Sequence, residues 1–247
     1  MKEDSVRSVE RAFSILKAFK REDYKLSLSE IAARIQLPIT TTLRLAGTLE
    51  NLNMLRRHSD RTYSLGNQLY LLGSIAKVNF RPQQIIYPYM IQVRDNTKEA
   101  VSLYGVVGEE RACFEHVESL LSMRCVMRIG DRVPLWAGAG GKALLAFLGD
   151  DIIEREIAKA HKLTSSTIYK SEELRKELAG IRSLGYAISH GDREEGIFSI
   201  AVPIFNRKGN IEYSFSIAGP SQRFTEEKAM SLIPGIQAMC REIASQL

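Results

Sequence analysis

The apolar positions in the first part of the chain follow helical spacing. In Ser8–Phe19 they recur every three or four residues, which predicts an amphipathic helix. A second helix begins at Ser27, because Ser27 and Glu30 match a capping box, and Pro38 brings it to an end. A third helix opens with a threonine run and ends near Asn53, a residue type that tolerates the left-handed conformation after a helix.

Two short strand patterns follow these helices. Met54–His58 and Thr62–Leu65 predict a β-ribbon around Ser59-Asp60-Arg61. Helix, turn, helix and ribbon in this order are typical of a winged helix-turn-helix, which places its second helix in the DNA major groove. A small helical subdomain with solvated arginines would explain any one of these features, but the ordered set favours DNA binding.

The predicted DNA contacts lie early in the second helix of this module and along the ribbon. One threonine hydroxyl is expected to cap the helix while the others point outward, toward bases and phosphates. The arginines of the ribbon are expected to contact the DNA backbone. The predicted DNA-binding residues are Thr40, Thr41, Thr42, Arg44, Arg56, Arg57 and Arg61.

The character of the chain changes after Gly66. Leu69–Val78 is more apolar than a surface helix on a monomer requires, which predicts a linker helix buried against a second copy. From residue 83 onward, short β-branched strands and helices are mixed without regular βαβ alternation, which predicts an α+β domain with an antiparallel sheet and flanking helices. The predicted domains are therefore 1–66, the linker helix 67–82, and 83–247.

Within 83–247 we expect Ser171 and Thr225 to be helix N-caps and Pro88 to kink a helix. Helices are predicted at 83–97, 138–148, 150–160, 171–184 and 225–246, and strands at 101–107, 111–117, 123–129, 186–189, 199–205 and 212–218.

Composition and charge narrow the class of protein. Residues 1–66 carry 12 Lys and Arg against 8 Asp and Glu, a net charge of +4 out of the +5 of the whole chain. A basic module beside a nearly neutral body suits phosphate binding. The three cysteines form no C-x-x-C pair, and we find neither a membrane span nor a secretory signal, so the sequence predicts a cytoplasmic protein.

Two segments contain residues that could bind a phosphate or a metal ion. Gly138–Ala143 lacks the residues of a Walker A loop, because Trp136 and Ala143 stand where Gly and Ser or Thr are needed. Its small residues either leave backbone N–H groups free for a carboxylate or serve close helix packing. His190–Gly196 contains metal-capable side chains, but the histidines are scattered, which favours a solvated loop.

Taken together, several segments resemble the IclR (isocitrate lyase regulator) family of bacterial transcription factors. They are 8–12, 27–65, 130–147 and 185–220, so the resemblance spans nearly the whole chain. It implies a winged helix, a linker helix used in dimerisation, and a C-terminal effector domain of GAF-like fold. It also implies dimers or tetramers on palindromic operators, controlled by a small metabolite that is often an organic acid.

The same resemblance implies an effector pocket. The backbone at Ala139 and Gly140 would hold a ligand carboxylate, three serines would line the opposite wall, and two residues would add apolar packing. This chain has Ser189 where some members have an acidic residue, Ser199 where many have Cys, and Ala218 at a position that can be Ser. We therefore expect a roomier, less negative pocket that takes a hydroxylated or larger carboxylate. The implied effector-binding residues are Cys125, Val133, Ala139, Gly140, Ser189, Ser199 and Ser216.

The sequence therefore predicts a bacterial DNA-binding transcriptional regulator, without a cofactor or metal, whose operator affinity an effector controls. The alternative is a small-molecule enzyme with an appended helical module. It is disfavoured because no activated nucleophile, general-base pair, metal set or cofactor loop stands out. A pure scaffolding protein would leave the basic wing unexplained.

Overall fold

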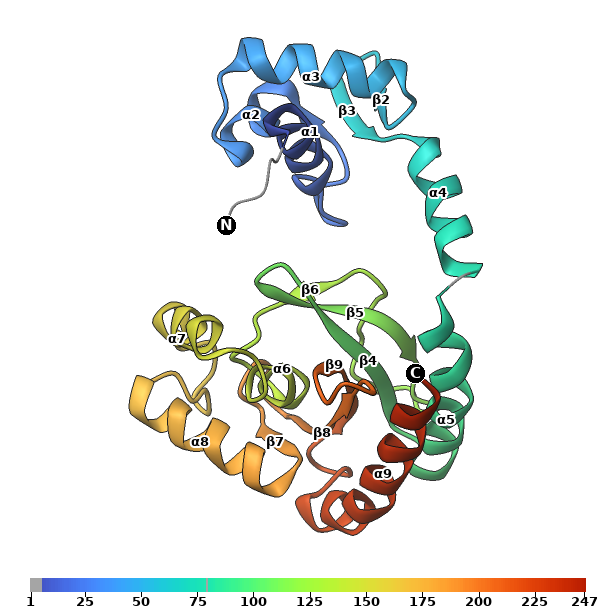
Figure 1. The fold of residues 1–247 in the computed structure, drawn as a ribbon, viewed down its shortest axis with the longest axis vertical. Coiled ribbons are helices and arrows are strands. Elements are labelled where there is room, and N and C mark those ends of the chain that lie inside the picture. The colour runs from blue at the N-terminus through green and yellow to red at the C-terminus, as the bar shows by residue number, and fades with distance from the viewer. Residues whose placement is uncertain (1–5, 79) are drawn as a thin grey trace. The chain divides into compact units, whose positions relative to one another are not determined.

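The computed structural model describes residues 6–78 and 80–247 (Figure 1). The chain forms two compact units, Met1–Phe80 and Arg81–Leu247. Each unit has its own hydrophobic core. The division between the units falls inside the predicted linker 67–82, two residues before the predicted start of the second domain.

The first unit combines helices with a small antiparallel sheet in the strand order β1-β3-β2. The core is formed by apolar side chains from all three N-terminal helices and the sheet, among them Ile15, Ile31, Ala46 and Tyr63. β1 was not predicted because only two residues pair in it. The elements are α1 (Arg7–Lys17), β1 (Leu26–Ser27), α2 (Leu28–Ile35), α3 (Ile39–Asn51), β2 (Leu55–Arg57), β3 (Thr62–Leu65) and α4 (Asn67–Val78).

The helix ends of this unit test the capping predictions. The capping box is confirmed, since the Ser27 N–H donates to a Glu30 carboxylate oxygen at 2.7 Å and the Glu30 N–H donates to Ser27 Oγ. Asn53 has φ 54°, as predicted. The predicted threonine cap of α3 is wrong: Pro38 is the N-cap, with no side-chain hydrogen bond, so the threonine run lies inside the helix.

The second unit is built on a six-stranded sheet in the order β6-β5-β4-β9-β8-β7. All neighbouring strands are antiparallel, which confirms the predicted sheet. The elements are α5 (Arg81–Thr97), β4 (Ala100–Val107), β5 (Glu110–Val117), β6 (Arg132–Val133), α6 (Ala139–Leu145), α7 (Asp150–Lys159), α8 (Ser171–Leu184), β7 (Ala187–His190), β8 (Ile197–Phe205), β9 (Ile211–Pro220) and α9 (Glu226–Gln246).

Helices cover both faces of this sheet (Figure 1). α5 and α9 pack against one face, while α6 packs against the other and is followed by α7 and α8. The buried side chains of α6, α7 and α8 join those of the strands in one apolar core. Because α6 touches β4, β9, β8 and β7, it lies over the part of the sheet that runs from β4 to the β7 edge.

Three local predictions have different outcomes. Residues 123–129 are not a strand: Cys125 and Met127 are buried and their neighbours exposed, so the alternation is real, but no ladder pairs this segment in the described part of the chain. Ser171 does not cap α8, because Lys170 is the N-cap and provides no side-chain bond. Thr225 does cap α9, accepting from the Lys228 N–H.

In the described residues, no helix is long and apolar enough to cross a membrane.

Candidate DNA-binding surface and effector cavity

The start of α3 carries the predicted recognition residues. Thr40 and Arg44 are exposed and Thr41 is partly buried, so these side chains are accessible from solvent. Thr42 is fully buried and its hydroxyl donates to the Pro38 carbonyl at 3.1 Å. The prediction of a DNA contact for Thr42 is therefore wrong, because helical spacing places this residue on the same inward side as Ala46.

The wing presents the predicted arginines. Arg56 and Arg57 are exposed on β2, and Arg61 is exposed in the turn with φ 62°. The Asp60 carboxylate accepts hydrogen bonds from the backbone and hydroxyl of Thr62, which holds the turn in shape. The Arg57 guanidinium lies 5.9 Å from the centre of the Tyr63 ring. The described unit thus shows an exposed helix start and a basic ribbon.

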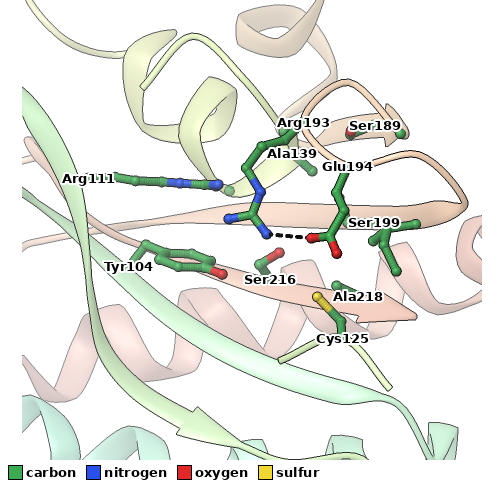
Figure 2. Close-up of a pocket in the computed structure, with 14 residues that line it drawn as sticks. Tyr104, Arg111, Cys125, Ala139, Ser189, Arg193, Glu194, Ser199, Ser216 and Ala218 are labelled. Atoms are coloured by element: carbon green, nitrogen blue, oxygen red, sulfur yellow. Dashed lines mark hydrogen bonds and ion pairs between the residues drawn. The ribbon is translucent and has the colours of Figure 1, made fainter. Parts of the chain in front are cut away.

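The second unit contains a cavity between α6 and the sheet (Figure 2). Strand register explains the polar wall, since Ser189, Ser199 and Ala218 are direct cross-strand neighbours on β7, β8 and β9. Ser216 lies two residues from Ala218 and so faces the same side. Six of the seven implied effector residues line this cavity: Cys125, Ala139, Gly140, Ser189, Ser199 and Ser216.

Val133 is the implied residue that does not line the cavity. It lies on β6, partly exposed, and pairs in register with Arg111 on β5. β6 is the outermost strand of the sheet, and Arg111, the register partner of Val133 on the next strand, lines the cavity instead. The assignment of Val133 to the pocket is corrected accordingly.

The glycines at the start of α6 are required by packing. A Cβ atom on Gly140 would lie 2.7 Å from the Tyr104 ring and 2.8 Å from Arg111 Nη1. A Cβ on Gly141 would lie 2.4 Å from the Leu135 carbonyl oxygen. The Ser214 hydroxyl donates to the Gly140 carbonyl at 2.8 Å, which ties α6 to β9. Close packing therefore accounts for these glycines.

Arg111 and Tyr104 line one side of the cavity, and neither residue was predicted from the sequence. The Arg111 guanidinium lies 4.5 Å from the centre of the Tyr104 ring, a cation–π contact (Figure 2). Arg111 is 3% exposed, and burial lowers its pKa to about 10, so the group stays charged at neutral pH. The predicted strand 111–117 also contains Glu115 and His116, so no pattern in the sequence singled out Arg111.

The loop 191–196 brings further charge to the cavity. Arg193 and Glu194 line it and form an ion pair at 3.4 Å (Figure 2). Gly191 and Gly196, at the two ends of the loop, have φ 83° and 77°, a conformation that favours glycine. The solvated loop predicted here is thus correct only for its outer part, because Asp192 is buried.

Asp192 anchors the base of this loop. Its carboxylate pairs with Lys142 Nζ of α6 at 2.6 Å, and Lys142 also pairs with Glu177 at 2.9 Å. The Asp192 carbonyl accepts a hydrogen bond from Thr167 at 2.6 Å. Lys142 is 1% exposed, so the pair with Asp192 is shielded from water. The loop and α6 are therefore joined by a buried charge pair beside the cavity.

Two family patterns match the chain. Residues 8–59 match the IclR helix-turn-helix domain, and residues 78–245 match the domain described as Bacterial transcriptional regulator IclR C-terminal. The chain belongs to the IclR family. Members of this family are transcriptional regulators with a helix-turn-helix DNA-binding domain and a C-terminal effector domain, and both domains are present here.

Individual proteins support the same assignment. The chain is 32% identical to the HTH-type transcriptional regulator KdgR of Escherichia coli K12, over 99% of this chain and 94% of that protein. A putative IclR regulator from Silicibacter sp. has the same fold, with a TM-score of 0.89, 22% identity, and coverage of 97% and 95%. An IclR homologue from Microbacterium hydrocarbonoxydans, solved with 4-hydroxybenzoate, has a TM-score of 0.76, 25% identity and 96% coverage of both chains.

Proposed function

We propose that the first unit of this IclR-family regulator binds operator DNA through the start of α3 and through the wing. Thr40, Thr41 and Arg44 would contact bases or nearby phosphates, because α3 is the second helix of the module and its start is accessible. The wing arginines would contact the backbone: Arg56, Arg57 and Arg61. The observation that carries this proposal is the exposure of these side chains on the unit that holds most of the net charge.

We further propose that an organic acid in the cavity of the second unit controls operator affinity. Two arginines and three serine hydroxyls line this cavity, which suits an anion that also carries polar groups. The relative with 4-hydroxybenzoate supports a carboxylate ligand for this domain type. A coupling of about 1–3 kcal/mol between effector and operator, typical of such linkage, would change the affinity roughly 5–150-fold.

A homo-oligomer is part of the proposal and rests on α4. Tyr70, Leu71 and Ile75 are 76%, 53% and 62% exposed, an apolar helix surface that a second copy would bury. A dimer would place two helix-turn-helix units on a palindromic operator. Sedimentation of the full chain should give a dimer or tetramer, and Ile75→Glu should weaken it. A monomer at every concentration would refute this part.

The relatives are named as regulators, which supports a non-catalytic role for the second unit. A regulator that binds chromosomal DNA works in the cytoplasm, so we propose this location. The rival assignment, an enzyme, predicts turnover of a small carboxylate by the purified chain. Turnover that disappears when Arg111 is replaced would favour the enzyme.

The test of DNA binding uses the full chain and the DNA upstream of its own gene. Affinity for this duplex and for a scrambled duplex is measured at several salt concentrations. We expect a clear preference for the first duplex and a steep fall of affinity with salt, because each phosphate contact releases counterions. Equal affinity for both duplexes would refute operator recognition.

A further inference from the structure

Arg111 is unusual among the charged groups of the second unit because it is buried without an acidic partner. It is 3% exposed, its Nε has no hydrogen-bond partner among the described residues, and no carboxylate of those residues pairs with its guanidinium. Burying an unpaired charge is strongly unfavourable, because the charge loses its hydration and gains no partner in return. A group kept under this penalty, facing a cavity, is a candidate for binding a ligand of opposite charge.

The surroundings of Arg111 hold the guanidinium in a fixed position. The Tyr104 ring supports one face, with the centre of the ring 4.5 Å away. The missing side chain of Gly140 provides the space for Nη1, since a Cβ there would lie 2.8 Å from it. Tyr104 pairs with Cys113 and Val106 pairs with Arg111, so the Tyr104 and Arg111 side chains are diagonal neighbours on one face of the sheet. The arginine is therefore oriented before any ligand arrives.

The other charges of the cavity lining compensate one another. Arg193 pairs with Glu194 at 3.4 Å, and these two residues and Arg111 are the charged members among the lining residues that the structure describes. The lining therefore carries a net charge of +1, located at Arg111. Because the guanidinium lies against Gly140, an acid group in the cavity meets Arg111 as well as the backbone at the start of α6.

We propose that Arg111 binds the acid group of the effector and makes the cavity selective for organic anions over uncharged compounds. The hydroxyls of Ser189, Ser199 and Ser216 then face the remainder of the ligand and favour one that carries oxygen atoms. This assignment rests on the proposed effector role of the cavity.

Sulfate is the probe that tests Arg111 without knowledge of the effector. Thermal unfolding of the full chain is followed by the fluorescence of Trp136, the one tryptophan, which lies in the second unit. Sodium sulfate is titrated against sodium chloride at equal ionic strength. We expect a saturable rise of the midpoint for the unaltered protein and an apparent affinity at least about tenfold weaker for Arg111→Met, because charge-assisted hydrogen bonds are lost.

Arg132→Met is the matched control. It removes the same charge from the neighbouring strand, where Arg132 pairs in register with Ala112 and its side chain is 40% exposed. This variant should respond to sulfate like the unaltered protein. An equal response of Arg111→Met and Arg132→Met, or no saturable response of the unaltered protein, would overturn the assignment.

Crystals of the unaltered protein grown in bromide provide a second measurement that needs no variant. An anomalous peak beside the Arg111 guanidinium supports the assignment, and its absence contradicts it.

Operator binding separates the two proposals. If organic acids shift the operator affinity of Arg111→Met as they do for the unaltered protein, effector control stands and the assignment of Arg111 is wrong. If sulfate binds at Arg111 but no acid shifts operator affinity, the anion site stands and effector control is wrong.

Discussion

The two candidate sites differ in how their side chains relate to the folded core. The DNA-binding surface consists of exposed residues such as Arg44 and Arg57, which folding leaves in water. The cavity of the second unit holds Arg111 and its neighbours largely out of water, with Lys142 and Asp192 buried beside it. A charge buried beside the cavity loses its hydration and needs a partner of opposite charge, whereas a charge on the exposed surface stays hydrated. Removing an exposed arginine from the DNA-binding surface should therefore change binding alone, whereas removing a charge from the buried pair beside the cavity should lower stability.

The largest expected effect is that of Lys142→Met. It leaves Asp192 buried without its cation, so the free energy of unfolding of the second unit should fall by about 3–5 kcal/mol. Urea unfolding followed by Trp136 fluorescence measures this. Lys170→Met, which breaks an exposed pair with Glu173, is the control and should leave the stability almost unchanged. Equal effects of the two variants would contradict the larger contribution of the buried pair.

Substitutions on the DNA-binding surface should change DNA affinity and leave stability unaltered. Arg44→Ala should weaken operator binding by about 1–3 kcal/mol if it contacts a base. Arg57→Ala should weaken binding to all DNA sequences alike. It should also lower the slope of log affinity against log salt concentration by about one, because a phosphate contact is lost. Fluorescence anisotropy at several salt concentrations measures both quantities.

Two controls sharpen this test. Arg21→Ala removes an exposed charge from the loop between α1 and β1 and should leave operator affinity unchanged. Thr42→Val alters a buried side chain and should leave the sequence preference unchanged. A salt slope that stays constant in Arg57→Ala would exclude Arg57 from the interface.

A smaller effect is expected for Ser27→Ala. The substitution removes the N-cap of α2 and should lower the stability of the first unit by about 1 kcal/mol. Circular dichroism detects this transition, whereas Trp136 fluorescence does not, because the tryptophan belongs to the second unit. Ser14→Ala, inside α1, is the control, and an equal loss there would argue against a capping role.

The smallest effect concerns acid pH. Hydrogen bonds from Ser27 hold the pKa of the Glu30 carboxyl below its ordinary value of 4.5. A carboxyl with a lowered pKa in the folded state stabilises the fold above the unfolded-state pKa, and this contribution is lost as pH falls through the lowered value. The stability difference between the unaltered protein and Glu30→Gln should therefore shrink below about pH 4.5. A difference that stays constant to lower pH would contradict the capping interaction.

The sequence was more informative for the first unit than for the second. Helical periodicity, the Ser27 capping box and Asn53 are local signals, and each is found in the structure. The burial of Thr42 follows from the start of α3: Pro38 is the N-cap, so the helix begins before the threonine run and turns Thr42 toward the core.

The second unit depends on contacts between segments far apart in the chain. Alternation predicted strands at 101–107 and 199–205 correctly but also one at 123–129, because a burial pattern does not show whether a partner strand is available. The meeting of Tyr104, Arg111 and Gly140 depends on the register of β4 with β5 and on the docking of α6. No local pattern could predict it.

The most direct test of the account asks whether the cavity controls DNA binding. Operator affinity is measured with and without organic acids for the unaltered protein and for Ala218→Phe, which fills the cavity from β9. We predict that at least one acid changes the affinity of the unaltered protein by about 5–150-fold and has no effect on Ala218→Phe. An acid that binds the unaltered protein without changing operator affinity, or that acts equally on both proteins, would contradict the account.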